Sequence, residues 1–191
     1  MRLTGLATIG LIAMLAALSG CAQYKLIGTE RHDFGDFSVE PQIEWSSISQ
    51  GGIEIWTVNG PGLEAVYFAD GIEDGDPFFE RRFGEPDKQQ PLFRSPMNAN
   101  EAMEFVIDTL AVTGAGEVRA RGLRPKKFGA HAGFRFDLDY LDATGLEGRG
   151  MAHGAVIDGK LYLMLYLAPA EHYFDTYGGP VEAMFESLEA P

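Results

Sequence analysis

The dipeptide Asp158-Gly159 lies between two strand-like runs and constrains the fold more than any other short segment. It favours a two-residue type I′ turn, because both turn positions require a positive φ. Residues 145–157 lead into the turn and residues 160–168 follow it. Residues 161–167 are continuously apolar, which is typical of a strand covered on both faces. The chain is therefore predicted to form an antiparallel sheet in which this last strand is central.

Two further regions show the two-residue period of strands. Residues 134–140 alternate strictly, so one face is expected to pack on a core while the other meets water. Residues 52–58 alternate less regularly, and residues 65–68 form a second apolar run beyond the turn at 59–62. These last two strands are predicted to lie side by side as a first hairpin-like pair.

The clearest helix signal covers residues 99–112. Asn98 can cap its first turn, and Glu101 three residues later completes a capping box. An apolar stripe at helical spacing consists of Met103, Val106, Ile107 and Leu110. A second helix is predicted at residues 181–188. Between strand and helix, residues 73–97 are rich in turn formers. They also carry large apolar side chains, which indicates an ordered excursion that packs on the core: Phe78, Phe79, Phe83, Leu92 and Phe93.

Strands, a helix, more strands and a final helix define an α+β chain in which helices cover an antiparallel β-sheet. Over residues 37–189 this succession resembles the fold of the photosystem extrinsic protein PsbP and of the Ran nucleotide-release factor. The residues that carry the resemblance are Trp45, the strand Trp56-Thr57-Val58, the helix at 98–113, the segment Pro125-Lys126-Lys127-Phe128-Gly129 and the hairpin at 148–168. The resemblance implies an α/β/α sandwich. That fold hosts unrelated roles, so no function is transferred with it.

The first twenty-one residues have the parts of a secretory signal peptide. Arg2 precedes an apolar run of about 16 residues, shorter than the roughly 20 that a spanning helix needs. The run ends in Leu18-Ser19-Gly20-Cys21, which resembles the lipobox of bacterial lipoproteins, here of a proteobacterial family. The resemblance implies cleavage before Cys21, diacylation of its sulfur and acylation of the new amino group, with palmitate as a typical acyl chain. Ala22, which is not aspartate, implies sorting to the outer membrane by the rule of Gram-negative lipoproteins.

This resemblance also divides the chain. Residues 1–20 are the expected signal peptide, residues 21–36 a lipidated N-terminus and tether, and residues 37–191 a single globular domain. Within the tether, residues 24–27 could form a short strand. Two or three acyl chains together anchor a protein stably, so the mature chain is expected to be tethered to the periplasmic face of a membrane rather than to span it. The lone thiol is consumed by the lipid, which excludes a cysteine nucleophile.

Charge and cysteine content exclude several classes of protein. The chain has 15 basic and 28 acidic side chains, a net charge of -13, and removal of Arg2 with the signal peptide leaves -14. Such a surface repels phosphate backbones, so no nucleic-acid partner is expected. With one cysteine, neither an intrachain disulfide nor a multi-cysteine zinc site can form.

Signals for catalysis are weak. The histidines His32, His131, His153 and His172 have no metal-type spacing, and no nucleophile elbow or phosphate-binding glycine loop is present. The acids near residue 75 could offer oxygen ligands to calcium, but a solvated acidic turn is the favoured interpretation because the EF-hand spacing is missing: Asp70, Glu73, Asp74, Asp76 and Glu80. No metal, cofactor or catalytic residue is predicted.

Five of the 14 basic side chains of the mature chain fall within nine residues. They are Arg119, Arg121, Arg124, Lys126 and Lys127, called the basic cluster below. The favoured interpretation is structural, with these cations paired to Glu117, Asp137 or Asp139 on the wet face of the sheet. The alternative is a binding surface for an anionic headgroup, a polyanionic glycan or an acidic partner.

Three functions remain open from the sequence. The favoured one is a lipid-anchored, non-catalytic module of the cell envelope that binds a protein partner. The second is a carrier of a small apolar ligand or lipid, with a pocket lined by Trp45, Trp56, Phe78 and Phe93. The third is a hydrolase, which would need a histidine and an acid together in a cleft.

Overall fold

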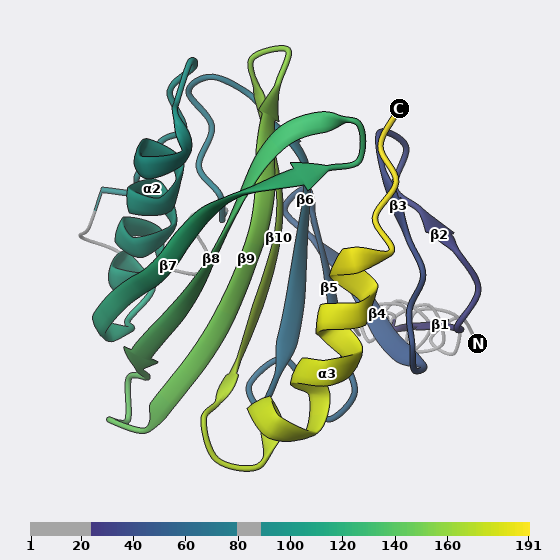
Figure 1. Ribbon diagram of the computed structural model, residues 1–191. Helices are drawn as coiled ribbons and strands as arrows, with labels where there is room; N and C mark the ends of the chain where they lie inside the picture. Colours follow the sequence, from purple (N-terminus) through teal and green to yellow (C-terminus); the bar gives the residue numbers. More distant parts are fainter. Residues whose placement is uncertain (1–23, 80–88) are drawn as a thin grey trace, which may run out of the picture.

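A computed structural model describes residues 24–79 and 89–191 of the chain. Eight strands form one antiparallel sheet in the order β1-β4-β5-β6-β10-β9-β8-β7 (Figure 1). The strands are β1 (Lys25–Ile27), β4 (Trp45–Gln50), β5 (Ile53–Thr57), β6 (Ala65–Ile72), β7 (Gly116–Phe128), β8 (His131–Leu141), β9 (Glu147–Ile157) and β10 (Lys160–Pro169). A separate two-stranded ribbon joins β2 (His32–Asp33) to β3 (Ser38–Val39), and the helices are α2 (Ala99–Val112) and α3 (Tyr173–Glu186).

The hairpin predicted at residues 158–159 is confirmed. Asp158 and Gly159 have φ angles of 49° and 83°, and Lys160 pairs with Ile157 directly across the turn. The strand after the turn, β10, lies between β6 and β9 in the middle of the sheet. The predicted pairing of the two earlier strands is confirmed as well, because β5 is hydrogen-bonded to β6.

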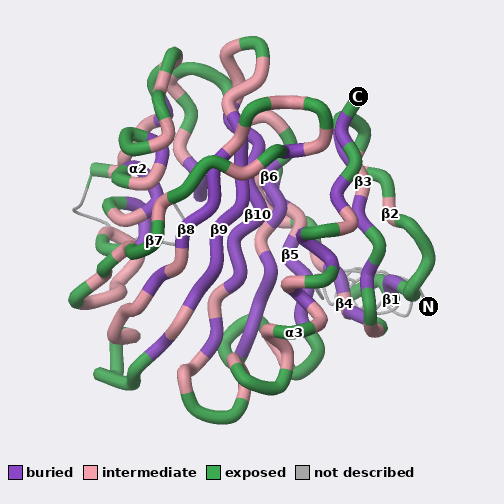
Figure 2. The backbone as a smooth tube through the Cα atoms, viewed as in Figure 1, coloured by how far each residue is buried: buried purple, intermediate pink, exposed green. Residues whose placement is uncertain are grey.

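Both faces of the sheet are covered. Leu163 belongs to a core that includes Phe105 of α2, whereas the next residue, Met164, belongs to a core that includes Phe185 of α3. Neighbouring residues of a strand point to opposite faces, so α2 and α3 pack on opposite sides of the sheet. Figure 2 shows the buried residues concentrated along the central strands between these layers.

Helix α2 begins and ends where the sequence predicted. Asn98 accepts hydrogen bonds from the backbone of residues 100 and 101, and the Glu101 carboxylate accepts the Asn98 backbone N–H at 2.7 Å. The excursion at 73–97 packs as expected in its described part, with Phe78, Phe79 and Phe93 buried in the α2 core. Phe83 lies outside the described residues.

Helix α3 is longer than predicted, and this part of the prediction is corrected. It starts at Tyr173 rather than near residue 181, and it contains Pro180. Gly178, Gly179 and Pro180 have poor helix propensity, which hid the first turns in the sequence. Aromatic residues of those turns pack against the core and outweigh that propensity: Tyr173, Phe174 and Tyr177.

The predicted tether at residues 21–36 is also corrected, in its described part. Lys25–Ile27 form β1, which pairs along its whole length with β4, and Ile27 is buried in the α3 core. Phe34 stacks on Phe68 with ring centroids 4.6 Å apart. The folded domain therefore begins at β1, not at residue 37. Within the described residues, no helix is both long and apolar enough to cross a bilayer.

Candidate functional site

The basic cluster lies on β7, an edge strand of the sheet. A long edge strand exposes unpaired backbone groups that invite association with other chains. Here the pairing with β8 shifts register between Arg121 and Arg124, and Pro125 removes one N–H donor. Register shifts, proline and charged side chains commonly prevent an edge strand from pairing with another chain. The composition of β7 therefore has a structural explanation.

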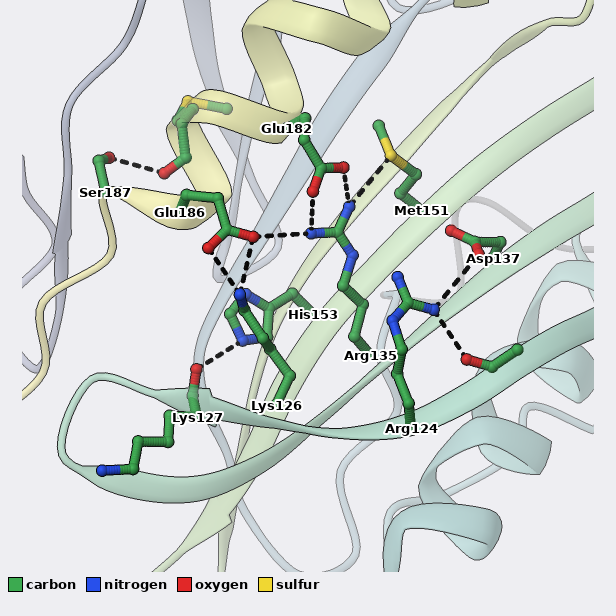
Figure 3. A network of polar contacts seen from close by, with 12 residues as sticks. Arg124, Lys126, Lys127, Arg135, Asp137, Met151, His153, Glu182, Glu186 and Ser187 are labelled. Carbon is green, nitrogen blue, oxygen red and sulfur yellow. Dashed lines mark hydrogen bonds and ion pairs between the residues drawn. The ribbon is translucent and has the colours of Figure 1, made fainter.

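Four cations of the basic cluster have acidic partners. The three arginines pair with the acids that the favoured interpretation of the sequence named, whereas Lys126 pairs with an acid of α3 that it did not name. Arg121 lies 3.0 Å from Asp139, and Arg124 lies 3.4 Å from Asp137 on the neighbouring strand (Figure 3 shows the second pair). The other two pairs are Arg119 with Glu117 at 3.0 Å and Lys126 with Glu186 at 2.6 Å. Within the described part of the chain, Lys127 forms no ion pair.

A buried arginine connects this face of the sheet to α3. Arg135 of β8 has a side chain only 3% exposed, and its two terminal nitrogens bind both carboxylate oxygens of Glu182, one of them at 2.6 Å (Figure 3). Glu186, one turn further along α3, lies 3.5 Å from the same guanidinium. The Arg135 Nε is buried without a hydrogen-bond partner among the described residues. A bidentate pair of this kind fixes both the position and the rotation of the helix.

His153 lies beside Arg135 on the next strand and is equally buried. Its Nε2 lies 2.9 Å from the Lys127 carbonyl oxygen, which can only accept, so Nε2 carries the proton. Burial is the main cause that lowers the pKa of His153 to about 4, and the charges of Arg135 and Lys126 lower it further. The ring is therefore neutral at pH 7. Its Nδ1 has no hydrogen-bond partner in the described structure.

Sequence reasoning missed this network, which we call the Arg135 network: Arg135, His153, Glu182 and Glu186. The alternation at residues 134–140 placed Arg135 on the face expected to meet water. The structure puts that face under α3 at this point, so the side chain is buried. Among residues 24–79 and 89–191, no acid is hydrogen-bonded to His153, and the acids of the network are bound to Arg135, where they hold the helix.

The other histidines lie apart. His131 contacts the Pro191 carbonyl, His172 precedes α3, and His32 packs edge-on against Phe34 and Trp56. Of these three histidines, only His32 forms an ion pair with an acid within the described residues, with its Nε2 3.6 Å from Glu54. The acids near the buried His153 are held by Arg135 and Lys126, so the described residues do not show the open histidine–acid cleft that a hydrolase would need.

The acids near residue 75 are also dispersed. Glu73 pairs with Lys160 at 2.7 Å, and Asp74 accepts the Ser95 backbone N–H at 2.9 Å. Partial burial, together with the negative charges of nearby Asp36 and Asp33, raises the pKa of Asp70 to about 6. In residues 24–79 and 89–191, no group of three or more metal-ligating side chains is placed to hold an ion. Glu80 lies outside the described residues.

The pocket expected for a ligand carrier does not form from the predicted side chains. Trp45 and Trp56 are buried in the α3 core, whereas Phe78 and Phe93 are buried in the α2 core on the other face. A surface hollow of about 570 Å³ lies between the β2–β3 ribbon and the C-terminal residues, but polar groups such as Asp33, Asp36 and Glu189 contribute to its wall. Its lining does not match the aromatic one that the sequence suggested.

We expect the substitution Arg121→Glu to lower the free energy of unfolding by at most about 1 kcal/mol, because both partners of the pair with Asp139 are about half exposed. Thermal or urea unfolding measures the change. A loss well above that range would mean that the pair is coupled to the Arg135 network.

Comparison with known proteins identifies a fold rather than a family. No protein-family model and no curated sequence matches the chain. Among solved structures, the chain is similar to the cyanobacterial PsbP (CyanoP) of Synechocystis sp. PCC 6803, with a TM-score of 0.51 and 15% identity over 91% of this chain and 96% of that one. The PsbP-like fold predicted from the sequence is thereby supported.

A second solved structure is LpqN of Mycobacterium tuberculosis, described as involved in cell envelope biogenesis. It aligns with 91% of this chain and 88% of its own length, with a TM-score of 0.39 and 9% identity. At that level of similarity it carries no argument about this protein. The lipidation site predicted at Cys21 lies outside the described residues, so neither the structure nor these comparisons bear on it.

Proposed function

We propose that the protein is a lipid-anchored accessory module of the cell envelope that holds its α+β domain at a membrane and binds a protein partner without catalysis. The observation that carries the proposal is the motif Leu18-Ser19-Gly20-Cys21 at the end of a short apolar run that follows Arg2. Acyl chains on Cys21 would anchor the chain through the hydrophobic effect, each buried methylene contributing about 0.8 kcal/mol. Ala22 after the cysteine favours the periplasmic face of the outer membrane.

The partner surface that we propose is the exposed edge of β7. Four cations of the basic cluster are engaged by acids, so Lys127 at the end of the strand is the cation left for an acidic partner within the described structure. A salt-sensitive association that is lost in Lys127→Glu, in a variant that unfolds like the wild type, would support this surface. Wild-type association of Lys127→Glu at every salt concentration would remove it.

The anchor is tested by the substitution Cys21→Ser in the full-length chain. We expect wild-type protein to incorporate a palmitate analogue, to lose residues 1–20 and to sediment with membranes. Cys21→Ser should incorporate no analogue and should be either soluble or an uncleaved precursor. Because the chain has only one cysteine, label on sulfur can report no other site. Equal membrane association of the two proteins, with no acyl label in either, would contradict the proposal.

A further inference from the structure

The distance along the chain between the proposed lipid and the sheet is very short. Three residue steps separate Cys21 from Tyr24, and Lys25 already belongs to β1. A fully extended chain advances at most about 3.6 Å per residue, so the Cα atoms of Cys21 and Tyr24 are within about 11 Å of each other. The segment between the anchor and the domain is therefore at most about 11 Å long.

The start of β1 carries exposed apolar side chains. Tyr24 is 52% exposed and Leu26 is 67% exposed, the two largest values given for large hydrophobic residues in the described structure. Both point to the face of β1 opposite to that of the buried Ile27, because strand residues alternate. Lys25 between them is exposed as well.

We infer that the outer edge of β1 lies against the phospholipid bilayer, with Tyr24 and Leu26 in the headgroup layer. This inference rests on the proposed acylation of Cys21. A bilayer has a hydrocarbon core of about 30 Å within about 40–45 Å overall, which leaves a headgroup layer of about 5–8 Å on each side. An anchor held at that depth brings residues within about 11 Å into or next to this layer.

The side chains suit that location. Tyrosine has an apolar ring and a polar hydroxyl, and such side chains are enriched at membrane interfaces. Lys25 points to the same face as Ile27, so Tyr24 and Leu26 are the side chains placed to enter the headgroup layer. The Leu26 side chain is exposed to water in the folded domain, and contact with the bilayer would bury it.

Contact of β1 with the bilayer would set the orientation of the whole domain, because β1 is part of the sheet. All three residues of β1 pair with β4, and Ile27 is buried in the α3 core, so β1 is a fixed part of the domain. Strand β7 lies at the opposite edge, seven strand spacings away, which is about 30 Å for strands about 4.8 Å apart in a twisted sheet. The basic cluster would then face away from the bilayer, toward partners in the aqueous phase.

The test uses nitroxide labels on the lipidated full-length protein in phosphatidylcholine vesicles. With the sulfur of Cys21 acylated, an introduced cysteine is the only free thiol. Leu26→Cys places the label on β1, and Lys127→Cys places a matched label at the far edge. The reference for each is the same substitution in a Cys21→Ser chain that lacks residues 1–20, which has neither the acyl anchor nor the apolar N-terminal run. Both replaced side chains are exposed, so the fold should tolerate the labels.

We expect vesicle attachment to lower the collision rate of the label at 26 with a water-soluble nickel chelate several-fold and to raise its collision rate with oxygen. The label at 127 should not change. A floated protein whose label at 26 stays as accessible as in solution, or whose label at 127 is shielded instead, would overturn the inference and leave the anchor intact. A protein that does not float with the vesicles would overturn both.

Discussion

The substitution Glu182→Gln is expected to destabilise the protein by about 2 kcal/mol or more, a large effect for one half-exposed side chain. The reason is that it leaves the buried guanidinium of Arg135 with only Glu186, at 3.5 Å, as a charged partner. Removing one member of a buried pair costs about 3–5 kcal/mol, because the charge that remains cannot be hydrated. The remaining contact with Glu186 compensates part of this cost, so the expected value lies near or just below the low end of that range.

Removing the arginine of this pair should destabilise the protein less than removing the acid. Arg135→Met removes the buried charge, and the two acids left behind are each almost half exposed and can be hydrated. Glu186 also keeps Lys126 as a partner. Replacing a buried ion pair with apolar side chains is often neutral or stabilising, so the double variant Glu182→Gln/Arg135→Met should be more stable than Glu182→Gln alone.

These expectations form a double-mutant cycle. Urea unfolding of the wild type, of both single variants and of the double variant measures all four free energies of unfolding. The matched control is Asp139→Asn, which breaks the exposed pair with Arg121 and should cost at most about 1 kcal/mol. If Glu182→Gln were no more destabilising than Asp139→Asn, Arg135 would not be a buried charge that needs its partner.

The second large effect is a loss of stability as the pH falls from about 6.5 to about 4, caused by His153. Its pKa is about 4 in the folded protein and 6.5 in the unfolded chain, so the unfolded chain binds more protons between these values. Stability from this residue is therefore complete above pH 6.5 and is lost on acidification. A shift of this size corresponds to about 3 kcal/mol.

Asp70 acts in the opposite direction. Its pKa is raised from 3.8 to about 6, so its cost to the folded state is present above pH 6 and disappears as the carboxyl is protonated. Its side chain is largely exposed, and water screens much of this effect. Asp70 should therefore offset only part of the change that His153 causes between pH 4 and 6.

The measurement compares unfolding free energies of wild type and His153→Gln from pH 4 to 8. Glutamine can still donate an N–H to the Lys127 carbonyl but does not titrate in this range. The difference in unfolding free energy between wild type and His153→Gln should rise with pH up to about 6.5 and then become constant. The same pH dependence is expected when both proteins also carry Asp70→Asn. Parallel curves would show that His153 does not titrate with a lowered pKa.

Features set by neighbouring residues could be predicted from the sequence. The turn at Asp158-Gly159 needs only its own φ angles, and the cap of α2 needs only Asn98 and Glu101. The pairing of Arg121 with Asp139 was also accessible, because a strand that folds back on the next one brings their wet faces together.

Features that depend on distant contacts could not be predicted in this way. The sequence suggested a short strand at residues 24–27 but not its partner, because β1 pairs with β4, about 20 residues later, and its three residues carry no period of their own. Arg135 alternates like a solvent-facing residue, and only the course of α3 over β8 and β9 shows that it is buried. The first turns of α3 contradict their own propensity and are held by packing.

The central claim is that Cys21 is the mature N-terminus and carries the acyl chains that hold the domain at the membrane. Mass spectrometry of the N-terminal peptide from membrane-fraction protein tests it most directly. If Cys21 is lipidated as proposed, the peptide begins at Cys21 and has added mass for a diacylglyceryl group and an amide-linked acyl chain. The proposal of lipidation would be wrong if the peptide from the membrane fraction had an unmodified Cys21 or still contained residues before Cys21.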